Sequence, residues 1–241
     1  MTGAVQLVLD GTTCAVEPGT SYLDAFAGQG VSLPTLCHHP RLTPVGSCGV
    51  CAIEVRAPGR SEWRLVSACA TRVEAGTEAR SSSDALTAAR QLTLQLLLDR
   101  HDPALRHLPE RAKAGRFPIV CACRGHARCE LRSMCRDLGA VPGETERPVA
   151  KPAVALRPRL ELEPSKCVLC ERCVRACQEL AEVGALGLVG RGRELRVAHA
   201  LAPDSSALAT CDTCAEGSPP CVEVCPTDAL HAPHPKKGGR K

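Results

Sequence analysis

Aromatic side chains are scarce in this sequence: its 241 residues include one Trp, one Tyr and two Phe. Aromatic residues dominate the buried area of many protein cores, so this chain needs another means of organising its interior. No stretch approaches the roughly 18 consecutive apolar residues of a transmembrane helix. The first residues, MTGAVQLVLDG, lack the basic and apolar regions of a secretory signal. We therefore expect no membrane insertion and a cytoplasmic location.

Motifs for nucleotide binding and hydrolysis are also missing. The sequence has no Walker A motif and no G-x-G-x-x-G after an expected strand, and the glycines of GLVGRGRE at 187–194 lie between cysteine runs. No Ser-His-Asp or paired-carboxylate arrangement is recognisable. The net charge of +4 is mild, and the basic end at 231–241 reads as a disordered tail. These observations predict no catalytic site of its own and no nucleic-acid partner.

Cysteine, in contrast, is abundant, with 17 residues. So many cysteines would not persist as disulfides in a reducing cytosol, so metal ligation is the leading expectation. Cys14 stands apart in an expected strand and reads as a small buried hydrophobe. The others form three groups: Cys37, Cys48, Cys51 and Cys69; Cys121, Cys123, Cys129 and Cys135; and Cys167, Cys170, Cys173, Cys177, Cys211, Cys214, Cys221 and Cys225.

The last group consists of two four-cysteine runs, CVLCERCVRAC and CDTCAEGSPPCVEVCP, which resemble the bacterial ferredoxin pattern. The second run departs from the compact spacing, because six residues, AEGSPP, stand where two would suffice, and they read as a bulging loop before Cys221. In that pattern three cysteines of a run hold one [4Fe–4S] cluster, and the fourth ligates the cluster of the other run. C-x2-C pairs also build zinc sites, so a zinc-binding interaction scaffold without redox activity is the alternative. The spacing predicts two crossed ligand sets: Cys167, Cys170, Cys173 and Cys225 for one cluster, and Cys177, Cys211, Cys214 and Cys221 for the other.

Residues 1–75 read as a small α+β unit. Two alternating strands meet at Asp10-Gly11, a helix follows Ser21, and AIEV and RLVSACA form two further strands. The first cysteine group supplies a loop ligand, a C-x2-C pair and a remote strand ligand, as plant-type [2Fe–2S] proteins do, with a longer first loop. Gly46 and Gly49 flank Cys48, where the backbone must pass close to a cluster.

Two further segments are expected outside these units. Residues 84–101 read as a helix, because Ala85, Ala89, Leu92 and Leu96 recur at helical spacing. The stretch 140–164 is rich in proline and charge, which favours an extended connector into the last domain.

The segment PTLCHHPRLTPVGSCGVCAIEV resembles the [2Fe–2S] region of the large iron–sulfur subunit of bacterial NADH dehydrogenase (complex I). It is also similar to the small diaphorase-type subunit of NAD-reducing hydrogenases and to the N-terminal part of iron-only hydrogenases. SKCVLCERCVRACQEL and CVEVCPTDAL resemble the ferredoxin-like segment of the same family, so the resemblance covers about residues 3–230. It implies an α+β protein with a β-grasp [2Fe–2S] ferredoxin domain at 1–80, a helical middle segment at 81–145 and a 2[4Fe–4S] ferredoxin-like domain at 146–230. The [2Fe–2S] ligands implied are Cys37, Cys48, Cys51 and Cys69.

The middle group departs from this family. Relatives place a histidine at a helix end, followed by C-x2-C-x5-C, and these four ligands hold a further [4Fe–4S] cluster. Here the helix ends at His101 and CRGHARCEL resembles the end of the motif, but Leu105 replaces a cysteine and a basic insertion follows. Loss of the cluster, leaving free thiols, or a zinc ion are the alternatives. Two ligand sets remain open: Cys121, Cys123 and Cys129 with His101, or the same three with Cys135.

The resemblance implies an iron–sulfur electron-transfer subunit. Its cofactors would be one [2Fe–2S] cluster, two [4Fe–4S] clusters and, if the middle group also holds one, a third [4Fe–4S] cluster. Electrons would pass between a flavin- or NAD(P)H-handling subunit and a catalytic subunit of a hydrogenase, a formate dehydrogenase or a complex I-like assembly. Iron bound by these cysteines, and no substrate pocket, is the expected basis of the function.

Overall fold

The computed structural model describes residues 3–101, 129–140, 153–199 and 206–231. These residues form two compact units. Within the described segments, the first unit comprises residues 3–98 and 131–140, and the second comprises the remainder. None of the helices in these segments combines the length and the apolar character that crossing a bilayer requires. About half of the predicted middle segment, and residues 232–241 of the basic tail, lie outside the described residues.

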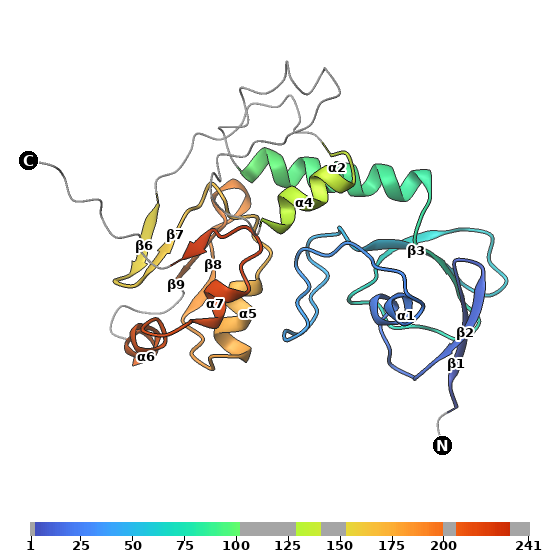
Figure 1. Ribbon diagram of the computed structural model, residues 1–241, viewed down its shortest axis with the longest axis horizontal. Coiled ribbons are helices and arrows are strands. Elements are labelled where there is room, and N and C mark those ends of the chain that lie inside the picture. Colours follow the sequence, from blue (N-terminus) through green and yellow to red (C-terminus); the bar gives the residue numbers. More distant parts are fainter. Residues whose placement is uncertain (1–2, 102–128, 141–152, 200–205, 232–241) are drawn as a thin grey trace, which may run out of the picture. The chain divides into compact units, whose positions relative to one another are not determined.

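The first unit is built around a five-stranded mixed sheet in the order β2-β1-β5-β3-β4 (Figure 1). β1 pairs antiparallel with β2 and parallel with β5, whereas β3 pairs antiparallel with both β5 and β4. Asp10 and Gly11 join β1 to β2 with positive φ angles of 46° and 82°, as a two-residue hairpin turn requires. The strands are β1 (Val5–Leu9), β2 (Thr12–Val16), β3 (Ala52–Arg56), β4 (Arg64–Ser67) and β5 (Glu78–Arg80).

Helix α1 (Tyr22–Gly28) provides the two aromatic side chains of this core. Ser21 caps the helix, because its Oγ accepts the Asp24 N–H at 3.1 Å. Tyr22 and Phe26 are fully buried, and the Tyr22 hydroxyl lies 2.8 Å from Oγ1 of Thr77. Their neighbours in the core include Leu7, Leu9, Ala25, Ile53, Ala68 and Ala79.

Helix α2 (Asp84–His101) begins after Ser83, whose Oγ accepts the Leu86 N–H at 3.1 Å. The helix itself is as expected from the sequence, but its buried face is a different one. Leu92 and Leu96 are 57% and 62% exposed, so this expected stripe does not pack into the core. The buried stripe is instead formed by residues at four-residue spacing: Leu86, Arg90, Leu94 and Leu98.

Helix α4 (Glu130–Asp137) has a short buried stripe, Leu131 and Cys135. The helix ends at Gly139, which has a φ of 65°, and the Ala140 N–H donates to the Cys135 carbonyl at 2.9 Å. Nε2 of Gln91 donates to the Leu138 carbonyl at 3.0 Å. This bond fastens α2 to the end of α4 within the first unit.

The second unit contains two small sheets and three helices among its described residues (Figure 1). One sheet has the order β10-β7-β6, and the other is the antiparallel β8-β9 hairpin, closed by the turn η2 (Gly192–Glu194). The remaining elements are β6 (Val154–Arg157), β7 (Leu160–Leu162), α5 (Arg172–Glu179), β8 (Leu186–Val189), β9 (Arg196–His199), α6 (Ser206–Cys214), α7 (Pro220–Glu223) and β10 (Leu230–His231).

The expected connector at 140–164 is wrong in its described part. Residues 154–157 and 160–162 form β6 and β7, and Leu160 and Leu162 are buried in the core of the second unit. β10 pairs with β7, with Leu230 opposite Leu162. The chain just before the first cysteine run is therefore a structural part of the domain, because the strand that follows the second run returns to pair with it.

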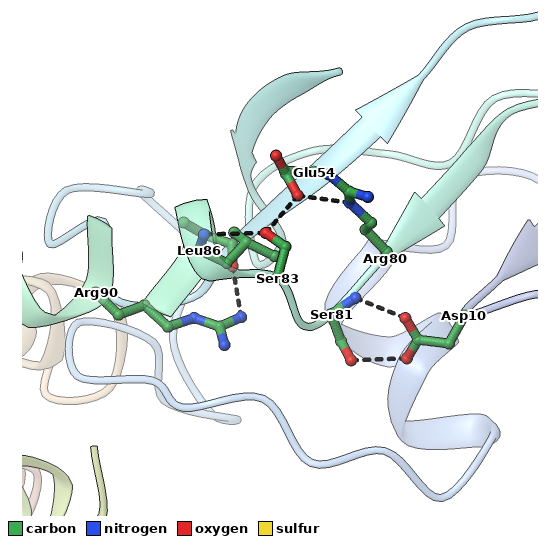
Figure 2. Close-up of polar contacts among 8 residues, drawn as sticks. Asp10, Glu54, Arg80, Ser81, Ser83, Leu86 and Arg90 are labelled. Carbon is green, nitrogen blue, oxygen red and sulfur yellow. Dashed lines mark hydrogen bonds and ion pairs between the residues drawn. The ribbon is translucent and has the colours of Figure 1, made fainter. Parts of the chain in front are cut away.

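Glu54 joins α2 to the sheet of the first unit (Figure 2). This β3 residue is 6% exposed, and its carboxylate accepts hydrogen bonds from Nε of Arg80 at 2.6 Å and Oγ of Ser83 at 2.7 Å. Since Arg80 and Ser83 both stabilise the ionised form, they hold the pKa of Glu54 below its ordinary value of 4.5. Arg80 also lies over the ring of Trp63, 4.2 Å from its centroid.

Replacing Glu54 with Gln should lower the free energy of unfolding of the first unit by about 1–3 kcal/mol at pH 7, because hydrogen bonds to a buried charge are lost. A carboxylate whose folded-state pKa is depressed stabilises the fold above its unfolded pKa, and this stabilisation disappears as the pH falls through the folded value. The difference between wild type and Glu54→Gln should therefore shrink below about pH 4.5. Urea unfolding can be followed by the fluorescence of Trp63, the single tryptophan.

The exposed Glu62 supplies the matched control, and Glu62→Gln should change stability by less than about 0.5 kcal/mol. A pH-independent difference for Glu54→Gln would contradict the role assigned to its charge.

Candidate metal centres

The first cysteine group converges in the first unit. Cys37, Cys51 and Cys69 are each 1% exposed, and Cys48 is partly buried. Sγ of Cys51 lies 3.4 Å from Sγ of Cys69, and the Cys37 thiol is hydrogen-bonded to those of Cys48 and Cys69. Cys51 directly precedes β3, and Cys69 lies two residues beyond β4. The antiparallel pairing of these two strands thus brings together ligands that are distant in sequence.

The loop around Cys48 wraps closely, as the two glycines predict. Gly46 and Gly49 have φ angles of 64° and 72°, which L-residues with side chains rarely adopt. A Cβ on Gly46 would also lie 3.0 Å from Cβ of Ala70. Backbone N–H groups reach the sulfurs here: Val50 donates to Cys48, and Cys69 donates to Cys51. Such bonds stabilise thiolates and orient ligands around a metal group.

Hydrogen bonds among the four thiols shift their pKa values in opposite directions. Hydrogen bonds from the Cys48 and Cys69 thiols hold the pKa of Cys37 far below its usual range, and the Cys69 thiol lowers the pKa of Cys51 to about 7. The pKa values of Cys48 and Cys69 are raised in turn by these same hydrogen bonds and by burial. Two sulfurs are thus stabilised as thiolates, and metal binding would have to displace the remaining protons.

The eight cysteines of the second unit surround two hollows. Both hollows are small and open in part to solvent. Cysteines of both sequence runs line each hollow. The first is lined by Cys167, Cys170, Cys173 and Cys225, and the second by Cys177, Cys211, Cys214 and Cys221. The structure therefore groups these side chains in the crossed arrangement that the spacing predicts.

The loop of the first run adopts an unusual backbone. Leu169 and Glu171, between successive cysteines, have positive φ angles of 53° and 62°. Bulky residues rarely adopt this conformation, and such strain is found chiefly at functional sites. It turns N–H groups towards the sulfurs: Leu169 donates to Cys167, and Arg172 donates to Cys170. At the second run, the Ala229 N–H donates to Sγ of Cys225 at 3.2 Å.

Burial raises the pKa of the thiols around these hollows. Both Cys170 and Cys221 are raised to about 12 by burial, and Cys173 is raised well above its ordinary value for the same reason. Unlike the first group, these thiols therefore favour the neutral form when no metal is bound. A metal group would ionise them and release protons.

The longer spacing before Cys221 has a local structural explanation. The residues AEGSPP do not extend as a free loop to the ligand, because Pro220 begins helix α7 and Cys221 is its second residue. Proline suits the first helical position, where no N–H donor is needed. Helix α7 thus places Cys221 at 7% exposure beside the second hollow.

The middle group is described only in part. Cys121 and Cys123 lie outside the described residues, and so does the side chain of His101 at the end of α2. Cys129 and Cys135 are 5% and 0% exposed, and Cys129 directly precedes α4. The choice between His101 and Cys135 as a fourth ligand therefore stays open.

An ion pair that the sequence does not predict fixes the residue after Cys129. Glu130 accepts a bidentate pair from Arg172 at 2.7 and 2.8 Å, and its N–H donates to the Pro226 carbonyl at 2.9 Å. Arg172 is 3% exposed and belongs to the first cysteine run, while Pro226 follows Cys225. These bonds tie the residue that follows Cys129 to both cysteine runs of the second unit. The only feature of the sequence that could have indicated this ion pair is an arginine within a run of predicted metal ligands.

No group of three or more His, Cys, Asp or Glu side chains in the described segments is arranged to hold a single metal ion. The cysteines instead gather in sets of four. Four cysteines for each group is the donor set of ferredoxin-type iron–sulfur clusters. The fold and the sites together define an iron–sulfur protein of the ferredoxin type.

Comparison with known protein families agrees with the ferredoxin-type class and identifies the families of two segments of the chain. Residues 2–84 match the 2Fe-2S iron-sulfur cluster binding domain, and residues 157–231 match the ferredoxin-like domain of NADH-quinone oxidoreductase subunit 3. The chain therefore combines these two domains. The family resemblance inferred from the sequence is confirmed, as are the α+β class and the two ferredoxin-like ends.

Relatives with known names cover nearly the whole chain. The chain is 31% identical over 228 residues to the NADPH-Fe(3+) oxidoreductase subunit alpha of Geobacter sulfurreducens, covering 94% of this chain and 24% of that protein. It is 31% identical over 232 residues to a subunit of the NADH-quinone oxidoreductase of Rhizobium meliloti, with the same coverage. The chain thus spans about a quarter of the length of these curated relatives.

A solved structure of an NAD+-reducing [NiFe]-hydrogenase in the H2-reduced state contains a chain of similar extent. It is 26% identical to this chain and superimposes with a TM-score of 0.68, covering 98% of this chain and 88% of the other.

Replacing Glu130 with Gln should destabilise the second unit around α5 by about 1–3 kcal/mol, because the buried Arg172 guanidinium would lose its charged partner. Hydrogen exchange measured by mass spectrometry should show faster exchange of the α5 amides. Asp137→Asn on the same helix is the control, since its ion pair with Arg136 is exposed and contributes less than about 1 kcal/mol. Equal effects of the two variants would refute a special role for the buried pair.

Proposed function

We propose that this chain is an iron–sulfur electron-transfer subunit that holds one [2Fe–2S] cluster and two [4Fe–4S] clusters. The observation that carries the proposal is the gathering of cysteines into separate four-residue sets. Such clusters, when bound, accept and release single electrons. The proposed [2Fe–2S] ligands are Cys37, Cys48, Cys51 and Cys69. The proposed [4Fe–4S] ligands are Cys167, Cys170, Cys173 and Cys225 for one cluster, and Cys177, Cys211, Cys214 and Cys221 for the other.

The protein's own contribution is to bury the cluster ligands and to direct N–H groups at their sulfurs. Hydrogen bonds to cluster sulfurs and solvent exposure both tune reduction potentials. The left-handed residues Leu169 and Glu171, and the glycines around Cys48, serve this purpose in the two units. The apolar lining of the second hollow, which includes Leu160, Val183 and Leu186, keeps water away from the sulfurs.

The proposed partner subunits are inferred from the names of the related proteins. We infer that electrons pass between a flavin- or NAD(P)H-handling subunit and a catalytic oxidoreductase subunit, because the related proteins are named for NADPH-Fe(3+) oxidoreductase, NADH-quinone oxidoreductase and NAD+-reducing hydrogenase. The absence of a catalytic site of its own, the cytoplasmic location and the division at 1–80, 81–145 and 146–230 remain predictions. A fourth cluster at Cys121, Cys123 and Cys129, completed by His101 or Cys135, is a further proposal.

Anaerobically purified protein should contain about 10 iron atoms per chain, or about 14 if the middle group also holds a [4Fe–4S] cluster. Dithionite should reduce these clusters and produce EPR signals of both cluster types. Metal analysis and EPR on the same sample provide the measurement. Stoichiometric zinc with negligible iron and no EPR signal would replace this proposal with the zinc-binding scaffold.

The crossed ligand sets can be tested by replacing Cys177 with Ser. Although Cys177 belongs to the first run, we expect loss of the cluster held by Cys211, Cys214 and Cys221, and retention of the [2Fe–2S] signal. Iron content and low-temperature EPR would measure the loss, which should approach about four iron atoms per chain. Cys14→Ser is the matched control and should keep the full iron content, because Cys14 lies in β2, outside every proposed set.

A further inference from the structure

Arg90 occupies a position on α2 at which an apolar side chain would be ordinary. It shares its helix face with Leu86, Leu94 and Leu98 at four-residue spacing, and it is only 8% exposed. Burying a charge is costly unless the charge is paired and hydrogen-bonded. We therefore expect a group of opposite charge near Arg90 that offsets the free-energy cost of burying its guanidinium.

The described protein atoms around Arg90 satisfy only some of its hydrogen-bond donors and do not neutralise its charge. Its Nη2 donates to the carbonyl of Ala52 at 2.6 Å. The dashed line from Arg90 in Figure 2 marks this bond. The buried Nε has no hydrogen-bond partner, and within the described segments no carboxylate pairs with this guanidinium. A neutral carbonyl satisfies one N–H group but does not neutralise the charge.

The surroundings of Arg90 point to the proposed [2Fe–2S] site. Ala52 begins β3 and directly follows the ligand Cys51, so the bond from Arg90 ends on the residue next to a proposed ligand. One turn further along α2, Thr93 approaches Gly49 between Cys48 and Cys51, with Oγ1 3.8 Å from the position of an added Cβ. The buried face of α2 therefore covers the C-x2-C loop.

An electrostatic attraction also links Arg90 to the thiolate of Cys51. Burial lowers the pKa of Arg90, and the Cys51 thiolate partly opposes this effect by attraction. Arginine remains protonated in proteins, so Arg90 is a fixed cation at all working pH values.

We propose that Arg90 is the buried countercharge of the [2Fe–2S] cluster and raises its reduction potential. The inference rests on the proposed cluster at Cys37, Cys48, Cys51 and Cys69. Reduction adds one electron to a cluster that is already anionic with its four thiolates. A nearby fixed cation stabilises the reduced form more than the oxidised form. Arg90 acts through its charge and its hold on the ligand loop, and it is not a ligand.

The test is an anaerobic redox titration of the full-length holoprotein, monitored by EPR at a temperature where only the [2Fe–2S] signal remains sharp. Arg90→Gln removes the charge and keeps an amide donor for the Ala52 carbonyl. For unit charges about 10 Å apart at an effective dielectric constant of about 20, Coulomb's law gives an effect on the order of tenfold. We expect the ratio of reduced to oxidised cluster at the wild-type midpoint to fall about tenfold, equivalent to about 59 mV for a one-electron couple.

Three further variants separate charge from structure. Arg90→Lys keeps the cation and should retain most of the wild-type potential. Arg90→Met matches the leucine stripe, so it should fold even if Arg90→Gln does not, and it should shift the potential in the same direction. Arg60→Gln removes an exposed charge from the β3-β4 loop and should leave the potential near that of wild type.

An unchanged potential in a charge-removing variant that retains its [2Fe–2S] signal would overturn the proposal. Failure of all three Arg90 variants to assemble this cluster would also overturn it, and would assign Arg90 to folding alone. A wild-type protein without any [2Fe–2S] signal would instead refute the proposed cluster itself.

Discussion

Thiolates that are packed against one another repel electrostatically. A protein can therefore hold four of them at one site only if positive charge at that site compensates the repulsion. In the first unit, hydrogen bonds between the thiols lower the pKa of Cys37 and Cys51 and raise the pKa of Cys48 and Cys69. The strand pairing, the left-handed glycines and the cover provided by α2 all serve to hold these sulfurs together. In the second unit burial favours neutral thiols until a metal group ionises them. The two units therefore meet the same repulsion by different means.

The cysteine positions were the most predictable part of this protein. Ligand spacing is a short-range property of the chain, so the two hollows contain the predicted sets although their members come from distant runs. The Asp10-Gly11 hairpin and the Ser21 cap were predictable for the same reason, because local turn and cap chemistry determines them.

Features that depend on tertiary contacts were not predictable. Strand β5 has three residues and no alternating pattern, and it exists because β1 and β3 flank it. The proline-rich approach to the first run becomes β6 and β7, because β10 returns from the other end of the unit to pair with β7. On α2 the apolar periodicity allowed two faces, and the sheet selected the one that contains Arg90. The partner of Arg172 could not be inferred from a charge pattern, because Glu130 lies in a different part of the sequence.

The exchange of one cysteine between the two runs has a consequence for how the second unit assembles. With the proposed ligands, each cluster closes a chain loop that contains part of the other cluster's binding run. Closing the first loop reduces the entropic cost of closing the second, because the separated ends have already been brought together. Insertion of either cluster would thus lower the entropic cost of completing the site of the other. Metal acquisition and folding of the second unit would then be linked processes.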